Sequence, residues 1–271
     1  MRSTRVRAEL AAALAGIRAG AGQGLAAWPV LVGRCVFFVL LMVVLSTLWD
    51  RVAAERASAL AVAAPDAGFA VYVGVTEWIT LSLPHLHLRF EDEIRRGGLE
   101  PALLRPKSHL LQILSQSYGG ALARLAVLGV VGLAMLALSG RPVPTVEALT
   151  MLPLLGMLAL MVGVLLYALA GLAAFWTPRT LPLQLVIQKL MFLLGGLFAP
   201  ITLYPDWLER ISAASPFAAH LYWAGAQALE PSMGRAAQGL AWQVLWIGVL
   251  GGLCALVWRA GIAKVLREGG A

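Results

Sequence analysis

Charged residues are concentrated in one stretch of this chain, Glu91-Asp-Glu-Ile-Arg-Arg-Gly-Gly-Leu-Glu-Pro-Ala-Leu-Leu-Arg-Pro106. The stretch lies between long apolar runs, in a sequence of 271 residues that is 60% hydrophobic and only 13% charged. Soluble domains contain about 25% charged residues, so this composition, with a mean hydropathy of +0.80, indicates an integral membrane protein. The charged stretch has to face water, and we expect it to contact a partner there.

The apolar runs predict an all-α polytopic membrane protein. A helix needs about 20 apolar residues to cross a hydrocarbon core about 30 Å thick. Helices also pair their backbone groups internally, as lipid requires. We expect six spans, of which the fifth is short because Pro200 ends it. The spans cover residues 28–49, 68–88, 118–138, 149–176, 183–199 and 240–258.

Two end segments flank the transmembrane domain, which we place at residues 28–260. Residues 1–27 have Leu10 and Leu14 at helical spacing, which predicts an amphipathic helix on the membrane surface. A basic tail that only sets topology explains this segment equally well. Residues 261–271 form the tail at the other end.

The basic residues predict the orientation. Most of them lie in both end segments, in the charged stretch and before the fifth span, so these parts are expected in the cytoplasm with both termini. The same distribution explains the net charge of +7 without nucleic-acid binding. The segment between spans five and six, residues 200–233, is then on the outer side. None of its apolar runs is long enough to cross the membrane. We therefore expect the segment to be re-entrant, with a short helix that ends before Pro216.

The charged stretch has the pattern of a short helix. Glu91 precedes Arg95, and Asp92 precedes Arg96, by four residues, an order that contributes about 0.2–0.5 kcal/mol per pair. Gly97 and the glycine after it would end this helix. A loop that only fixes topology needs the cations alone, so the interleaved acids favour a docking element.

Three stretches resemble the membrane subunits of ABC-2 type exporters, in particular the small six-span permeases. They are Ile94-Arg-Arg-Gly-Gly-Leu-Glu-Pro-Ala-Leu-Leu-Arg-Pro106, Ala174-Phe-Trp-Thr177, and Gly195-Gly-Leu-Phe-Ala-Pro-Ile-Thr-Leu-Tyr-Pro-Asp-Trp-Leu208 followed by Ser215-Pro-Phe217. The first is similar to the family's pattern after the second span, and the second closes the fourth span. The third is similar to the family's fifth span and re-entrant outer hairpin.

The resemblance implies one half of a transporter in the bacterial cytoplasmic membrane, coupled to a separate ABC ATPase subunit. The chain has no Gly-x-x-x-x-Gly-Lys-Ser/Thr phosphate loop, so ATP and Mg²⁺ would bind to the partner. This chain would then bind no cofactor or metal and catalyse no reaction, and a second permease, the same chain or a related one, would complete the pathway among the membrane lipids. The residues expected to contact the ATPase are Glu91, Asp92, Glu93, Arg95, Arg96, Gly97 and Leu104.

Three polar residues inside or at the ends of spans are candidates for the translocation pathway. Glu77 lies within the second span, where a carboxylate costs about 2.5–3.5 kcal/mol and is a functional candidate. It could instead lie nearer the outer interface, bonded to its neighbours. Gln184 and Gln188 begin the fifth span and could line a vestibule or bond to adjacent helices. The expected outer gate consists of Pro200, Pro205, Asp206, Trp207 and Pro216.

The main alternative is a secondary transporter that uses an ion gradient, with Glu77 as its coupling carboxylate. Against it, the spans show no inverted repeat. A membrane scaffold or an intramembrane enzyme has no supporting motif. An apolar pathway would accept lipids, amphipathic drugs or hydrophobic cations, and the sequence does not decide between these and a polysaccharide or peptide.

Overall fold

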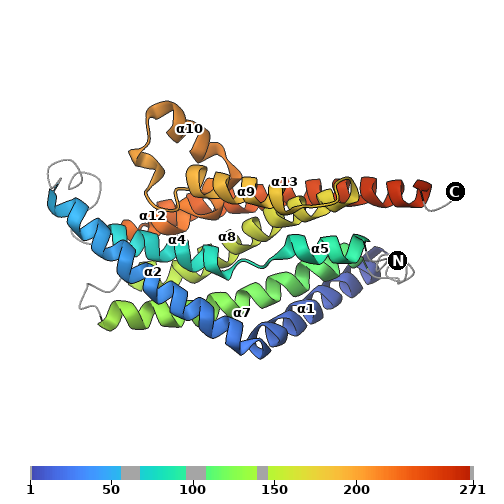
Figure 1. The fold of residues 1–271 in the computed structure, drawn as a ribbon, viewed down its shortest axis with the longest axis horizontal. Coiled ribbons are helices and arrows are strands. Elements are labelled where there is room, and N and C mark those ends of the chain that lie inside the picture. The colour runs from blue at the N-terminus through green and yellow to red at the C-terminus, as the bar shows by residue number, and fades with distance from the viewer. Residues whose placement is uncertain (1, 56–67, 96–107, 139–145, 269–271) are drawn as a thin grey trace.

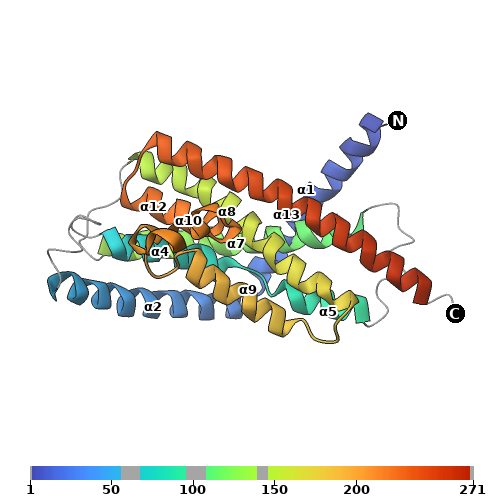
Figure 2. The same ribbon diagram turned by 90° about the horizontal axis from the view of Figure 1, so that it is seen from above.

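The structure, a computed structural model, describes residues 2–55, 68–95, 108–138 and 146–268. Within these ranges it consists of helices and short connections, without strands, which confirms the all-α prediction. The long helices run roughly along one axis, and helix α1 begins at the same end of the molecule at which helix α13 finishes (Figure 1). Helices α13 and α2 lie along opposite edges of the bundle, with α4 and α8 between them (Figure 2).

The first two helices meet at a sharp bend. Residues Arg2–Ala26 form helix α1, whose expected position on the membrane surface stays a prediction, and helix α2 (Trp28–Glu55) contains the first predicted span. Helix α1 packs in parallel along the first half of α7, where glycines let the backbones touch. A Cβ atom at Gly20 would lie only 1.9 Å from the carbonyl oxygen of Gln116. The apolar side chains of Leu10 and Leu14 remain exposed on α1.

The predicted second span, 68–88, is interrupted. Helix α4 (Gly68–Ser82) ends before Pro84, and helix α5 (Leu86–Arg95) begins after it. Proline has no N–H for the helical ladder, and its ring disfavours the helical conformation of the preceding residue. The helix of the charged stretch therefore begins at Leu86, before the stretch itself.

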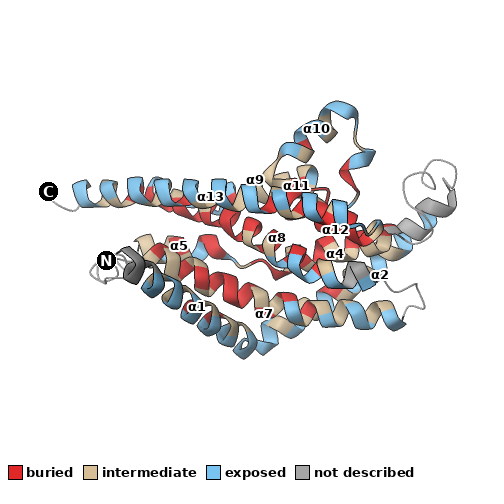
Figure 3. Cartoon of the chain, turned by 180° about the vertical axis from the view of Figure 1, so that it is seen from behind, coloured by how far each residue is buried: buried red, intermediate tan, exposed pale blue. Residues whose placement is uncertain are grey.

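Helices α7 and α8 form the centre of the bundle. Helix α7 (His109–Leu138) begins well before the predicted start at residue 118. Helix α8 (Val146–Leu172), followed by the 3-10 turn η1 (Ala173–Phe175), is mostly buried. Figure 3 shows this burial, which contrasts with the exposed outer faces of α1, α2 and α13. Because α8 contacts protein on most sides, its sequence is apolar all round rather than amphipathic.

The helix of the fifth predicted span is shorter than predicted. Helix α9 (Leu181–Leu194) ends before residue 199 and before Pro200, at a turn in which Gly196 has a φ of 69°. Only glycine adopts that conformation readily. Two hydroxyl groups of α4 hold the turn: Tyr72 donates to the carbonyl of Gly196 at 2.5 Å, and Thr76 donates to that of Leu197 at 2.8 Å.

Short helices fill the segment between the fifth and sixth predicted spans. They are the 3-10 turn η2 (Ile201–Leu203), α10 (Asp206–Ala214), α11 (Pro216–His220) and α12 (Tyr222–Leu229). Helix α10 confirms the short helix expected before Pro216, and it projects from the bundle (Figure 1). Helices α11 and α12 are buried against α8 and α4.

The last helix, α13 (Met233–Glu268), extends well beyond the predicted span 240–258 and includes most of the expected tail. Four helical segments of the described chain are long and apolar enough to cross a membrane: Trp28–Leu48, His109–Leu138, Thr150–Phe175 and Met233–Arg267. Helices α4 and α9 have 15 and 14 residues, which is less than the roughly 20 that a crossing requires. The count of six spans therefore stays a prediction.

Candidate functional site

The acidic residues of α5 are bound by neighbouring elements. A carboxylate oxygen of Glu91 accepts a hydrogen bond from the backbone N–H of Thr180, just before α9, at 2.9 Å. Glu93 lies 2.5 Å from Nε2 of His109 on α7 and 3.6 Å from Nε of Arg89. Two of the acids expected to face an ATPase therefore link α5 to α9 and α7, which sequence periodicity could not reveal.

The other predicted coupling residues are placed only in part. Asp92 is exposed on α5, and Arg95 is the last described residue of that helix. Arg96, Gly97 and Leu104 lie outside the described residues. The predicted contact with an ATPase therefore stays a prediction, and its nearest described element is the end of α5.

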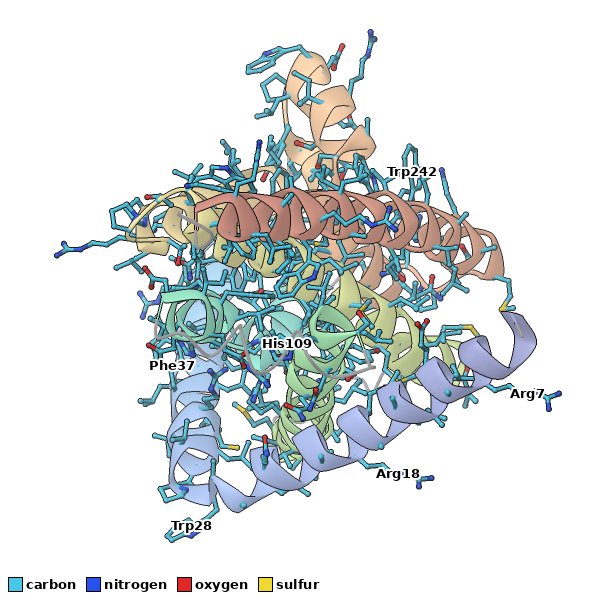
Figure 4. The ribbon with its side chains drawn as sticks, turned by 90° about the vertical axis from the view of Figure 1, so that its right-hand side faces the viewer. Arg7, Arg18, Trp28, Phe37, His109 and Trp242 are labelled. Carbon is cyan, nitrogen blue, oxygen red and sulfur yellow. The ribbon has the colours of Figure 1, made fainter. Side chains whose placement is uncertain are left out.

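An aromatic cluster fixes α5 to the ends of α8 and α13. The rings of Phe90 on α5 and Phe175 in η1 lie 6.5 and 5.6 Å from the ring of Trp258 on α13. His109 on α7 lies 6.0 Å from the same tryptophan. Figure 4 views the bundle from the end at which α13 finishes, and there His109 lies in the interior. Aromatic pairs of this kind add about 0.5–1.5 kcal/mol each beyond the area they bury.

Two glycines and a lysine complete this cluster, which we define as Phe90, Phe175, Trp258 and His109. A Cβ atom at Gly171 would lie 2.6 Å from the ring of Phe90, and one at Gly261 would lie 2.2 Å from the ring of Phe175. Nζ of Lys264 donates to the carbonyl of Phe175 at 2.9 Å. The sequence indicated this region only through Ala174-Phe-Trp-Thr177, because the partners come from four separate elements.

Two arginines satisfy the backbone at the break between α4 and α5. Arg34 on α2 donates to the carbonyls of Leu81 and Leu83, the latter at 3.3 Å. Arg124 on α7 donates through Nε to the carbonyl of Ser82 at 3.0 Å. Carbonyls at a helix C-terminus lack partners within the helix and carry a partial negative charge, so cations are favourable there.

The residues predicted to line the pathway lie in two different helices, α4 and α9. Glu77 is buried on α4, with 4% of its surface exposed, two turns before the break. Gln184 is also buried and begins α9, where its N–H donates to the carbonyl of Thr180, the residue bonded to Glu91. Gln188 is half-buried one turn later. The structure therefore places the glutamines beside α5 and Glu77 in α4, so a shared role stays a prediction.

Sequence inspection missed two buried polar residues. Nδ1 of His220 on α11 lies 2.7 Å from the carbonyl of Ala159 on α8. Nε2 of Gln243 on α13 donates to the carbonyls of Leu155 and Ala219 at 3.1 and 3.2 Å. The hydrogen bonds of both residues fix α11 to the central helix α8. In the sequence, only the isolated position of each polar residue in an apolar run indicated such a role.

The expected gate residues lie around α10 rather than in one constellation. Pro200 is buried, whereas Pro205, Asp206 and Trp207 are exposed at the start of α10. Pro216 begins α11 after Ser215, whose hydroxyl accepts from the N–H of Ala218 at 3.3 Å. Their role as a gate stays a prediction.

An apolar pocket of about 460 Å³ lies between α2, α4, α7 and α8. Met42, Trp78 and Leu128 are among its lining residues, and Trp78 is oriented by a hydrogen bond from Nε1 to the carbonyl of Leu125 at 2.6 Å. Glu77, Gln184 and Gln188 do not line this pocket. Its chemistry suits a hydrocarbon chain rather than a polar molecule.

Comparison with known proteins adds one match. A family model described as ABC-2 family transporter protein matches residues 69–269, from the start of α4 to the end of α13. No curated protein and no solved structure matches the chain. The match includes every element of the aromatic cluster, the break at Pro84 and the short helices α10, α11 and α12. With its long apolar helices, the chain is a multi-pass membrane protein, and it belongs to the ABC-2 family as the permease component of an ABC transporter.

Proposed function

We propose that this chain is the permease subunit of an ATP-driven ABC-2 type exporter in the bacterial cytoplasmic membrane. A separate ATPase subunit would bind ATP and Mg²⁺ and contact the segment that follows α5. A second permease, identical or related, would complete the translocation pathway. The observation that carries this proposal is the anchoring of α5 on three sides, at the end of the molecule where α5 and α13 finish (Figure 1).

The anchoring makes α5, whose last residues begin the charged stretch, a rigid element. Its end is held by the Glu91–Thr180 bond, the Glu93–His109 pair and the aromatic cluster. Hydrogen bonds to charged groups contribute about 1.5–3 kcal/mol each, so the ends of α7, α8, α9 and α13 would move with α5. A displacement imposed by the ATPase would then reach the break at Pro84, as alternating access requires.

The arrangement of the chain ends supports a cytoplasmic position for both termini. Helix α1 begins, and α5 and α13 finish, at one end of the molecule (Figure 1). Helices α4 and α9 would complete their crossings with the segments that follow them, which gives the six spans of the proposal. The projecting α10 and the buried α11 and α12 would then form the outer part of the pathway.

The apolar pocket supports an amphipathic or lipid-like cargo. Its volume of about 460 Å³ and its wall of aliphatic and aromatic side chains fit a hydrocarbon chain. The pocket lies between helices rather than at the end of the bundle, so a cargo could enter it from the membrane.

Burial of Glu77 favours a second candidate, a transporter that couples cargo to an ion gradient through this carboxylate. In that case the Glu77→Gln variant would lose transport, and collapse of the gradient would stop transport while ATP is present. An ATP-driven exporter would continue after collapse of the gradient.

The decisive experiment is purification of the tagged chain from its native host in mild detergent, with identification of the proteins that accompany it and an assay of ATP hydrolysis. We expect a stoichiometric subunit with a phosphate loop. The paired change Arg95→Glu and Arg96→Glu should weaken its association. Arg18→Glu, a charge reversal at an exposed position that points outward from α1 (Figure 4), is the matched control and should not. A chain that purifies alone, without ATPase activity, would overturn the proposal.

A further inference from the structure

A second pocket, of about 300 Å³, lies where α1, α2 and α7 meet the break between α4 and α5. Three arginines line it, each from a different element: Arg34 from α2, Arg89 from α5 and Arg124 from α7. The glycines of the α1–α7 contact also line it, so no bulky side chain fills its wall there. Neither the ABC-2 family match nor the proposed coupling route gives this pocket a role.

The pocket has an excess of positive charge. Among the described residues, no aspartate or glutamate lines it, so no carboxylate from this part of the chain neutralises the arginines from within. Glu93 lies 3.6 Å from Nε of Arg89 and also pairs with His109. The helix end that Arg34 and Arg124 contact supplies only about half an elementary negative charge. The pocket is therefore lined by three arginines, and the negative charge of the neighbouring groups does not balance their positive charge.

One donor of this cluster has no partner among the described residues. Nη2 of Arg124 is buried and makes no hydrogen bond, although Nε of the same side chain binds Ser82. A buried donor on a charged group that lacks an acceptor is destabilising, because its hydration is lost without replacement. The site therefore lacks an acceptor, and an anion in the pocket would supply it.

The remaining polar groups favour a phosphate group as that anion. Arg89 donates to the side chains of Gln116 and Ser117 at 2.6 and 3.4 Å, which holds its guanidinium at the wall of the pocket. Guanidinium groups bind phosphate oxygens through paired N–H donors. We propose that the pocket between α1, α2, α7 and the α4–α5 break binds the phosphate of an anionic phospholipid headgroup.

The surroundings of the pocket favour a lipid as the source of the phosphate. Trp28 and Val30, at the start of α2, have 66% and 62% of their surfaces exposed, so an acyl chain could lie along this apolar face. The bend at Trp28 forms a corner of the molecule (Figure 4). In the orientation of the proposed function, on which this step rests, the pocket faces the cytoplasmic leaflet, where basic pockets between helices bind anionic headgroups.

The test uses the full chain, with whatever partner it retains, in neutral detergent micelles without ATP. Thermal unfolding is followed while phosphatidylglycerol, phosphatidylcholine or inorganic phosphate is added. We expect phosphatidylglycerol to raise the midpoint far more than the other two, with saturation. In Arg124→Gln, the half-saturating amount of phosphatidylglycerol should rise about tenfold, the ratio that corresponds to 1.4 kcal/mol. The control Arg18→Gln, at an exposed position on α1, should match the unchanged protein.

Further variants keep the test informative if Arg124→Gln fails to fold. Arg89→Gln leaves the bonds of Arg34 and Arg124 to the helix end in place and should also weaken the response, while Arg89→Lys should restore part of it. Native mass spectrometry should count fewer retained anionic lipids in Arg89→Gln. An equal response to inorganic phosphate would keep the phosphate site and overturn the lipid source. Equal responses in all variants would overturn the site itself, whether or not an ATPase accompanies the chain.

Discussion

Replacement of Gly261 by alanine tests whether the aromatic cluster holds α5, α8 and α13 together. The added Cβ would lie 2.2 Å from Cδ2 of Phe175 and 2.4 Å from its Cγ. Carbon atoms in contact are separated by about 3.5–4.0 Å, so the ring would have to move by more than about 1 Å. Phe175 lies edge-on to Trp258 at 5.6 Å, so this movement would disturb that contact.

The expected cost follows from two opposing effects. Overpacking of a filled site costs about 1–3 kcal/mol, and alanine favours a helix over glycine by about 0.5–1 kcal/mol. We therefore expect a net loss of about 1–2 kcal/mol and a midpoint of thermal unfolding lower by several degrees, since each kcal/mol corresponds to about 2–4 °C for a chain of this size.

The matched control is Gly252→Ala, on the same helix, where no atom lies within 4 Å of the added Cβ. That variant should unfold at the same temperature as the unchanged protein or slightly higher. Unfolding is measured in detergent by tryptophan fluorescence, with ATP hydrolysis of the complex as a second readout. Equal midpoints for the two variants would refute the reasoning, because they would show that the ring of Phe175 moves without cost.

Three further substitutions test other contacts through the same unfolding measurement. Glu91→Ala removes the acceptor of the Thr180 N–H and should cost about 1–3 kcal/mol, whereas Glu91→Gln keeps an oxygen there and should cost less; equal losses would exclude this bond as the cause. Tyr72→Phe removes the donor to the carbonyl of Gly196 and should cost about 1 kcal/mol, so an unchanged midpoint would contradict its role in holding the turn after α9. Gly196→Ala places a side chain at a φ of 69° and a Cβ atom 2.8 Å from Oη of Tyr72, and it should cost at least about 1–2 kcal/mol; a smaller loss than in Gly234→Ala, an open position, would contradict this account.

The sequence predicted the helices but not where they stop. Apolar runs locate α2, α7, α8 and α13, because length and hydropathy alone decide whether a segment suits the membrane. Pro84 was visible within the second predicted span, yet composition could not show that α5 would resume so soon after it. The end of α9 depends on a glycine conformation and on two hydroxyl donors from α4, more than 100 residues earlier.

The candidate site shows the same division. Periodicity predicted a helix in the charged stretch and a pair between Glu91 and Arg95, whose side chain is not described; the carboxylate of Glu91 also accepts a hydrogen bond from the N–H of Thr180, 89 residues away. Among the described side chains of α5, Arg89 pairs with Glu93, which sequence inspection did not consider. Local spacing cannot reveal a partner from a distant element, although a half-buried carboxylate gains more from a fixed N–H donor than from an exposed cation.

The break between α4 and α5 constrains the order in which the protein can be assembled. Carbonyls at the end of α4 bind Arg34, which is made before them, and Arg124, which lies 42 residues after Ser82. Unpaired carbonyls are costly in lipid, so α4 cannot settle at its final depth until α7 has left the ribosome. Helices α4 and α7 should therefore enter the bilayer as one unit during synthesis, and a chain truncated between them should be degraded rather than retained.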